Sequence, residues 1–259
     1  MKASIVITHH KEPRLLFKLL KSLNSRISSY QFPISNYEII VVDSEAQKGG
    51  GRLIRKKFPE VRYVPFSKNV GYAKIVNAGL RLAKAPYILI VNADIAITPE
   101  EIVKMRIFLE ETKEAGAVGV SDCFTFPTLA TLIARRTFFA STPWGKRTLR
   151  HYEMRDYERK EPQVVDWVRG DCWMVKKSAL KKVGLMDERF FMYFEDTDWC
   201  RRAKAKGLSV FFLPGVHIIQ QKPGASRQKS IKGVLHRVSH LISFLRYWHK
   251  WNRKAKKSL

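Results

Sequence analysis

The first candidate functional residues in this 259-residue chain are Asn92-Ala93-Asp94, a polar triplet that interrupts the apolar, β-branched run Tyr87–Ile97. A run of this kind predicts a buried parallel strand with the triplet at its carboxyl end, where open α/β sheets bind ligands. The carboxylate of Asp94 and the amide oxygen of Asn92 suit a divalent cation that keeps water and phosphate ligands. Alternatively, these side chains only turn the chain and cap a helix that begins at Pro99.

A second acidic group, Glu195-Asp196-Thr197-Asp198, directly follows the apolar and aromatic residues 190–194. The pattern after it predicts a helix that continues to Gly207. Burial beside aromatic rings favours the protonated carboxyl group, whereas a helix N-terminus favours the carboxylate. That balance suits a general base, although acids in a first helical turn are also ordinary capping.

The elements that would position these residues alternate between strands and helices, which predicts an α/β fold with a parallel sheet. Three strands stop at polar residues, namely at Thr8, at Asp43 and at Asn92 with Asp94. Strands are expected at 3–8, 37–42, 61–65, 87–92, 117–120, 164–169 and 172–175, and helices at 13–23, from 51, at 71–83 and at 99–115.

The apolar residues show neither helical nor strand periodicity between Phe124 and Glu161, a stretch that contains Pro, Gly, Trp and many basic residues. So long a loop within a compact domain is usually functional, and we expect it to form a flap over an acceptor site.

Composition restricts the class of protein. The chain carries a formal net charge of +25, and no Asp or Glu follows Asp198. Such a surface predicts a polyanionic partner, either nucleic acid or an anionic membrane. No apolar run approaches the roughly 18 residues that span a bilayer, and no signal-peptide pattern opens the chain, so a cytoplasmic protein is expected. Three isolated cysteines, Cys123, Cys172 and Cys200, are interpreted as reduced core residues.

The basic C-terminal segment 227–259 predicts an amphipathic helix. Its apolar residues share one helical face, which comprises Val234, Val238, Leu241, Leu245 and Trp248. A helix of this kind lies in a membrane interface with its basic residues toward anionic headgroups. Alternatively, the helix packs on the domain and leaves a solvated basic tail.

Six segments, in one order and at matching spacing, resemble the inverting family 2 glycosyltransferases, and among them the rhamnosyltransferase-like branch. They are ASIVITHHKE, EIIVVDS, NVGYAKIVNAGL, YILIVNADI, the long segment from VRGDCWMV to FFMYFEDTDWCRR, and FFLPGV. The resemblance implies a GT-A nucleotide-diphospho-sugar transferase fold over residues 1–226, with one mixed, mainly parallel sheet flanked by helices. Residues 227–259 then form a C-terminal amphipathic helix and tail.

The resemblance also implies roles for individual residues. Asp196 is the catalytic base, Asp94 is the metal ligand for Mg²⁺ or Mn²⁺, and Glu195 borders the acceptor together with Gly170 and Asp171. The nucleotide-sugar pocket would be lined by Thr8, Asp43, Asn69, Gly71 and Asn92. The family's metal-binding histidine, six residues after a proline, corresponds to Gln220 here, and His217 stands three positions earlier.

The implied function is transfer of a sugar, for example rhamnose, from a dTDP- or UDP-sugar to a glycan or polyprenyl-linked acceptor in polysaccharide or cell-envelope synthesis. The implied location is cytoplasmic and peripheral, at the inner face of the cell membrane, with the C-terminal helix on the anionic surface. An alternative is a non-catalytic nucleotide-sugar-binding or scaffold protein of the same fold, which Asn92 and Gln220 favour. Nucleic-acid binding is not expected, because no recognition motif accompanies the charge.

Overall fold

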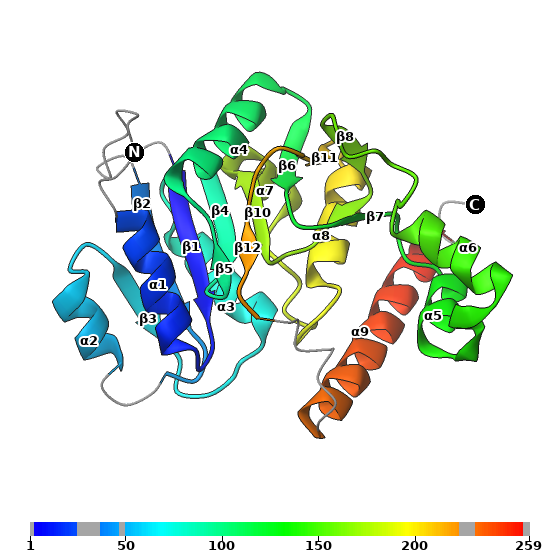
Figure 1. The fold of residues 1–259 in the computed structure, drawn as a ribbon, viewed down its shortest axis with the longest axis horizontal. Coiled ribbons are helices and arrows are strands. Elements are labelled where there is room, and N and C mark those ends of the chain that lie inside the picture. The colour runs from blue at the N-terminus through cyan, green and yellow to red at the C-terminus, as the bar shows by residue number, and fades with distance from the viewer. Residues whose placement is uncertain (1–2, 25–36, 47–49, 223–230, 256–259) are drawn as a thin grey trace.

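A computed structural model describes residues 3–24, 37–46, 50–222 and 231–255. The centre of this described part is an eight-stranded sheet in the order β3-β2-β1-β4-β10-β6-β11-β8 (Figure 1). Its strands are β1 (Ala3–His9), β2 (Tyr37–Asp43), β3 (Arg62–Pro65), β4 (Tyr87–Asn92), β6 (Ala115–Gly119), β8 (Gln163–Val165), β10 (Cys172–Lys176) and β11 (Ser209–Phe212). The mixed, mainly parallel α/β sheet expected from the sequence is confirmed.

One half of the sheet is parallel. Strands β3, β2, β1 and β4 run in the same direction, and their aliphatic residues are buried on both faces of β1 and β4. The register pairs Thr8 with Asn92, and His9 with Asp43. Polar side chains from three strand ends therefore reach one edge of the sheet.

Strand β10 runs antiparallel to both β4 and β6, which the alternating sequence pattern does not reveal. Cys172, the first residue of β10, lies opposite Val91 near the end of β4. Gly170 and Asp171 precede β10, so the reversal brings them to the same edge as Asn92. The backbone N–H of Asn92 donates to the carbonyl oxygen of Asp171 at 2.9 Å.

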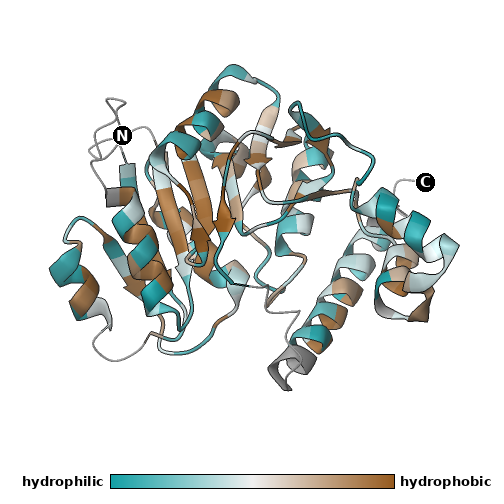
Figure 2. Ribbon diagram, viewed as in Figure 1, coloured by the Kyte–Doolittle hydropathy of each residue, from teal (hydrophilic) through white to brown (hydrophobic). Residues whose placement is uncertain are grey.

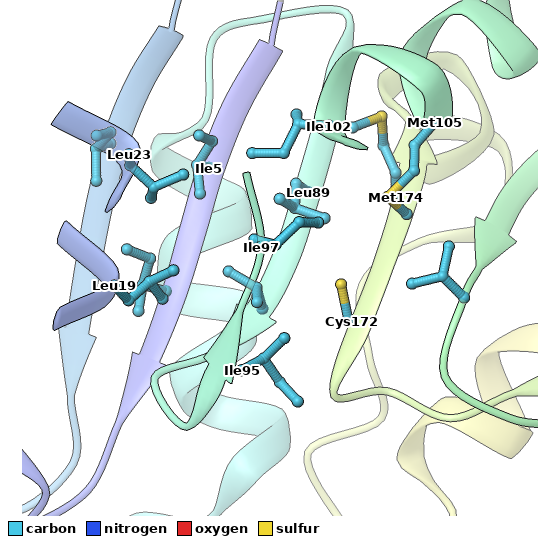
Figure 3. Packing of buried hydrophobic residues seen from close by; sticks show 14 of the residues in the cluster. Ile5, Leu19, Leu23, Leu89, Ile95, Ile97, Ile102, Met105, Cys172 and Met174 are labelled. Atoms are coloured by element: carbon cyan, nitrogen blue, oxygen red, sulfur yellow. The ribbon is translucent and has the colours of Figure 1, made fainter. Parts of the chain in front are cut away.

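Helices cover both faces of the sheet and bury two apolar layers, so that the brown strands of Figure 2 lie between helices with teal outer surfaces. One face packs against α1 (Pro13–Asn24), α2 (Gly50–Lys57) and α4 (Pro99–Glu111). Figure 3 shows this layer, with Leu23 of α1 beside Ile5 of β1. The other face packs against α3 (Tyr72–Leu82), α7 (Lys177–Val183) and α8 (Glu195–Ala205). Cys123, Cys172 and Cys200 are buried and free, as expected.

The expectation of a long irregular loop at 124–161 is wrong. The segment contains β7 (Cys123–Phe124), α5 (Leu129–Arg136), a 3₁₀ turn η2 (Phe138–Ser141) and α6 (Pro143–Tyr152). Strand β7 pairs with β9 (Trp167–Val168). Threonine side chains organise the helix starts, since Thr128 caps α5 and Thr142 caps α6. Because each helix has only two or three turns, periodicity gives too little signal to predict them.

Helix α9 (Ile231–Ala255) places different residues on its two faces. Phe244 and Tyr247 are buried with Phe190 and Phe194, and His240 and Ser243 are buried beside them. The predicted apolar face is largely exposed instead, since about half of the surface of Val238, Leu241 and Leu245 is accessible. Val234 and the domain boundary after residue 226 lie outside the residues whose side chains are described. Among the described helices, none has the length and apolar character needed to cross a bilayer.

Candidate active site

A pocket of about 250 Å³ opens at the carboxyl edge of the sheet, where β1 and β4 end. It gathers three of the residues expected from the sequence, Thr8, Asn92 and Asp94. The Thr8 hydroxyl donates to Oδ1 of Asn92 at 2.7 Å, which orients that amide. The rest of its lining comes from residues that the sequence did not single out, chiefly His9, His10, Glu12, Tyr72 and Lys222.

Asp94 sits at the turn between β4 and β5 (Ile95–Ala96), half-buried. Burial raises the pKa of its carboxyl group, and the nearby Asp171 raises it further, against hydrogen bonds that lower it. Strand β12 (Ile219–Gln220) pairs with β5 and brings Gln220 near Asp94, where its side chain lowers the pKa of that carboxyl group. His217 is exposed and does not line the pocket, and its backbone N–H donates to the Glu101 carboxylate at 2.8 Å.

Asp43, expected in the nucleotide pocket, lies just beneath it and is buried. The Tyr63 hydroxyl donates to its Oδ2 at 2.5 Å, and Nδ1 of His9 lies 2.8 Å from its Oδ1. Because the backbone N–H of Glu12 donates to Nε2 of His9, the ring proton belongs on Nδ1, facing Asp43. The carboxylate thus positions His9, a wall of the pocket.

Asn69 and Gly71 form a tight turn before α3. Oδ1 of Asn69 accepts hydrogen bonds from the Gly71 backbone N–H at 3.0 Å and from the Ser44 hydroxyl at 3.2 Å. Gly71 has φ +88°, and a Cβ there would lie 2.5 Å from the carbonyl oxygen of Phe191. Only glycine fits this conformation and this close approach. The turn is therefore fixed to the segment that precedes α8.

Asp196 lies in the first turn of α8, across Tyr72 from the pocket. Its Oδ2 accepts the Gly170 backbone N–H at 2.9 Å, and its Oδ1 accepts the Thr197 backbone N–H at 2.7 Å. The Tyr72 hydroxyl donates to the Gly170 carbonyl oxygen at 2.5 Å, so one tyrosine borders both groups. Burial raises the pKa of Asp196, these backbone hydrogen bonds oppose the rise, and Asp171 adds to it.

Two further carboxylates surround Asp196. Burial, followed by the charge of Asp196, raises the pKa of Glu195 well above its usual range, and its Oε2 has no hydrogen-bond partner among the described residues. Oδ2 of Asp171 lies 2.6 Å from Nε of Arg169, and within the same set of residues its buried Oδ1 has no hydrogen-bond partner either. The structure thus brings all four residues expected at the base and the acceptor border into one cluster.

The backbone that leads to Asp196 is strained, and helix α9 holds it in place. Tyr193 and Phe194 have φ values of 70° and 69°, in the left-handed region that costs non-glycine residues energy. Helix α9 packs on this segment, where the Ser243 hydroxyl donates to the Met192 carbonyl oxygen at 2.8 Å. The position of the candidate base therefore depends on contacts with α9.

A larger hollow of about 580 Å³ lies beside the C-terminal end of α6, lined by Arg150, Met154 and Tyr157 among others. It contains none of the expected site residues, and two of its acidic lining residues are already paired, Asp156 with Arg150 and Glu158 with Lys160. The smaller pocket, by contrast, contains the candidate ligand-binding residues Thr8, Asn92 and Asp94.

Whether this site can hold a divalent cation depends on the donor atoms at the carboxyl edge of the sheet. Within the described residues, no group of three or more His, Cys, Asp or Glu side chains is arranged to hold a metal. Asp94 with its amide neighbours Asn92 and Gln220 does supply the hard oxygen atoms that Mg²⁺ or Mn²⁺ accept, and such ions are commonly held by one or two carboxylates plus water and substrate phosphates. The residues fit a cation that the donor itself helps to bind.

The pocket thus carries a carboxylate, Asp94, at the end of a strand, and Tyr72 connects it through Gly170 to a second carboxylate, Asp196, at a helix N-terminus. The sequence pattern of glycosyl transferase family 2 matches residues 4–184, and the chain belongs to that family. The resemblance drawn from the six segments is confirmed, and the protein is a glycosyltransferase with an α/β fold of the GT-A type.

Several characterised proteins are similar to it. An N-acetylglucosaminyl-diphospho-decaprenol L-rhamnosyltransferase from Mycobacterium tuberculosis is 26% identical over 238 residues, which cover 84% of this chain and 75% of that protein. Rhamnosyltransferase WbbL from Escherichia coli is 24% identical over 227 residues, covering 83% and 81%.

Among solved structures, the mannosyltransferase PcManGT from Pyrobaculum calidifontis, in complex with GDP-Man and Mn²⁺, superimposes with a TM-score of 0.62 at 17% identity. The match covers 95% of this chain and 64% of the mannosyltransferase, so the chain spans somewhat less than two thirds of that protein.

Proposed function

We propose that the protein transfers a sugar with inversion from a nucleoside diphosphate sugar to an acceptor hydroxyl, with Asp196 as the base. The observation that carries this proposal is the setting of Asp196. Its carboxylate is oriented by the Gly170 N–H, is buried enough to have a raised pKa, and lies across Tyr72 from the pocket that ends at Asp94. A carboxylate with these properties can accept a proton near neutral pH.

The donor would lie in the pocket between β1 and β4. Thr8 and Asn92 would contact it directly, and Asp43, Asn69 and Gly71 would shape the part for the nucleotide. Asp94 would hold Mg²⁺ or Mn²⁺, with Gln220 orienting its carboxylate. The cation, when bound, would stabilise the negative charge of the departing diphosphate.

The reaction would be one displacement. Asp196 takes the proton of the acceptor hydroxyl as that oxygen bonds to the anomeric carbon, and the bond from that carbon to the phosphate oxygen breaks. The electron pair leaves with the nucleoside diphosphate. Because the attack comes from the face opposite the leaving group, the configuration inverts. Glu195, Gly170 and Asp171 border the acceptor side of Asp196.

The relatives suggest the substrates. Two of them are named rhamnosyltransferases, and the name of the mycobacterial protein includes a decaprenol-linked acceptor. We therefore propose rhamnose from a dTDP-sugar as donor, with a UDP-sugar as the alternative, and a polyprenyl-linked glycan as acceptor. Enzymes acting on such acceptors work at a membrane, so we place the protein at the inner face of the cell membrane. The exposed apolar face of α9 supports attachment there.

A second function has its own supporting observation. Asn92 replaces a carboxylate of the usual metal triplet and Gln220 replaces the usual histidine, so a non-catalytic nucleotide-sugar-binding protein is the alternative. Release of nucleoside diphosphate from a panel of nucleotide sugars, with Mn²⁺, Mg²⁺ or EDTA and with lipid acceptors, separates the two. Turnover of one donor that needs the metal and is lost in Asp94→Ala supports the transferase. Donor binding without turnover under every condition supports the binding protein.

A further inference from the structure

The segment between β7 and β8 forms a projecting helical hairpin with unusual chemistry. Helices α5 and α6 lie beside the C-terminal half of α9, away from the central sheet (Figure 1). Residues 125–152 contain no Asp or Glu, but they contain Arg135, Arg136, Lys146, Arg147 and Arg150. Neither the core nor the proposed catalytic machinery requires this composition.

Three aromatic side chains gather where α5 gives way to α6, and we call them the aromatic tip: Phe138, Phe139 and Trp144. Phe138 is 77% exposed and Trp144 is 47% exposed. The ring centroids of Phe138 and Phe139 are 4.2 Å apart, and those of Phe139 and Trp144 are 5.9 Å apart. Contiguous exposed aromatic surface of this kind marks an interaction site.

The aromatic tip is held by a closed turn. Thr142 caps α6 by accepting the Gly145 backbone N–H at 3.1 Å, and Thr137 accepts the Phe139 backbone N–H at 3.3 Å. Gly145 is buried, and a Cβ there would lie 1.8 Å from the carbonyl oxygen of Phe139. Glycine at position 145 therefore lets the start of α6 pack against the Phe139 backbone, which closes the turn that carries the three exposed rings.

The charges beside the aromatic tip favour an anionic partner. Lys146 and Arg147 follow Trp144 in α6, and both are exposed. Among the described residues, no acidic side chain pairs with either of them, whereas Arg150 on the next turn pairs with Asp156. Exposed aromatic rings flanked by lysine and arginine suit the headgroup region of an anionic membrane. A second copy of this chain, with its net charge of +25, would be repelled.

Helix α6 connects the aromatic tip to the candidate active site. It starts beside Trp144 and ends at Tyr152, which is buried and close enough to Asp196 for that carboxylate to contribute to its raised pKa, after burial itself. Ten helical residues span about 15 Å. Leu132 of α5 also packs on the aromatic cluster that contains Phe190 and Phe194.

From these observations we propose that the aromatic tip inserts into the interface of an anionic membrane and sets the acceptor side of Asp196 toward it. An acceptor carried by a lipid would then arrive at the base from the surface on which the hairpin rests. This last step rests on the proposed function, whereas the membrane contact itself does not.

Vesicle binding by the full chain tests the contact. The test variant is Phe138→Ser/Phe139→Ser/Trp144→Ser, and the matched control is Leu53→Ser/Ile107→Ser, which removes exposed apolar residues from α2 and α4. On phosphatidylcholine vesicles containing phosphatidylglycerol, we expect the test variant to bind at least about tenfold more weakly than wild type and the control to bind normally. Lys146→Gln/Arg147→Gln should weaken binding chiefly at low salt.

A second measurement distinguishes loss of the membrane contact from misfolding of the variant. Brominated lipids should quench part of the tryptophan fluorescence of the wild type, and Trp144→Phe, which keeps an apolar ring, should lose that part while still binding vesicles. Equal vesicle binding by the test variant and wild type would overturn the proposal. Loss of self-association in the test variant without loss of vesicle binding would also overturn it, in favour of contact between copies.

Donor turnover distinguishes this proposal from the proposed function. Without vesicles, the test variant should release nucleoside diphosphate at the wild-type rate, because the tip touches no donor residue. If neither protein turns over any donor while vesicle binding still depends on the tip, the membrane proposal stands and the transferase proposal fails.

Discussion

Replacing Lys250 by Met should loosen residues 192–198, which carry the candidate base Asp196 and which we call the catalytic segment, because this lysine joins α9 to α8. Its Nζ lies 2.7 Å from Oδ1 of Asp198 and 2.8 Å from Oδ2 of Asp187. Asp198 is fully buried, two residues after the candidate base. Trp251 of α9 also donates to Asp198, at 3.0 Å, so the inner face of α9 meets the first turn of α8 at one carboxylate.

The magnitude follows from what remains after the substitution. Removing one partner of a buried ion pair costs about 3–5 kcal/mol when the other charge is left alone. Asp198 keeps Arg202, whose Nε lies 2.9 Å from Oδ2, and it keeps Trp251. The loss should therefore approach that of hydrogen bonds to a charged group, about 2–3 kcal/mol in unfolding free energy.

Urea unfolding of Lys250→Met, beside Lys204→Met, measures this loss. Lys204 pairs with Asp166 at 2.6 Å, but its side chain is 65% exposed, so its removal should cost no more than about 1 kcal/mol. A double-mutant cycle with Asp198→Asn isolates the coupling. Lys250→Met should also slow transfer without weakening donor binding. Equal costs for the two lysine variants, or coupling near zero, would refute the argument that α9 holds the catalytic segment.

Three further predictions concern individual site residues. Asp196 must be ionised to act as a base, and its pKa is raised, so kcat should fall as pH drops through a value above the roughly 3.9 of an ordinary Asp; a pH–rate profile that stays flat down to that value contradicts this. The charge of Asp171 raises the pKa of Asp196 further, and the charge of Asp196 in turn raises the pKa values of Glu195, Tyr72, Tyr152 and Cys200. Because the folded pKa of Glu195 is raised, its contribution to stability is complete below the unfolded pKa of about 4.3 and is lost as pH rises through the folded pKa. Glu195→Gln should thus gain stability over wild type increasingly toward alkaline pH, and urea titrations showing a pH-independent difference would exclude this. Gly71→Ala should lower the free energy of unfolding by about 2 kcal/mol or more, and Gly207→Ala, which has φ +69° but open space around its Cβ position, by about 1 kcal/mol. Thermal unfolding that ranks the two variants the other way would show that Phe191 moves to accommodate the new methyl group.

The parallel half of the sheet was predictable because its strands are buried on both faces. Runs such as Tyr87–Asn92 are continuous and β-branched, and their ends mark where ligands bind. Asp94 could therefore be found from the sequence. The direction of β10 could not, because a short apolar strand looks the same in either direction.

The site was only partly predictable, because several members arrive through contacts between distant segments. Gln220 reaches Asp94 through the pairing of two short strands, and Lys222 lines the pocket next to it. His9 was given no role and lies one residue beyond the predicted strand 3–8, although the pairing of β1 with β2 sets it beside Asp43. A histidine facing an acid at adjacent strand ends is a signal that could have been noticed.

The two faces of α9 show why helical periodicity alone misleads. The pattern identified Leu241 and Leu245 as the apolar face, and in the structure that face is largely exposed. The buried face includes His240 and Ser243, because aromatic rings and a backbone carbonyl of the catalytic segment accommodate polar groups. Which face of α9 is buried depends on the surface of the domain against which it packs, and the sequence of the helix alone does not reveal that surface.

Transfer by Asp196→Asn, compared with wild type at saturating donor, tests the central claim most directly. Asparagine keeps the size and an oxygen that can accept the Gly170 N–H, but it cannot take a proton. Glu110→Gln, on the exposed side of α4, is the matched control. We predict unchanged donor binding and a loss of about 10²- to 10⁴-fold in transfer for Asp196→Asn only. Transfer at the wild-type rate by Asp196→Asn would contradict the assignment of the base.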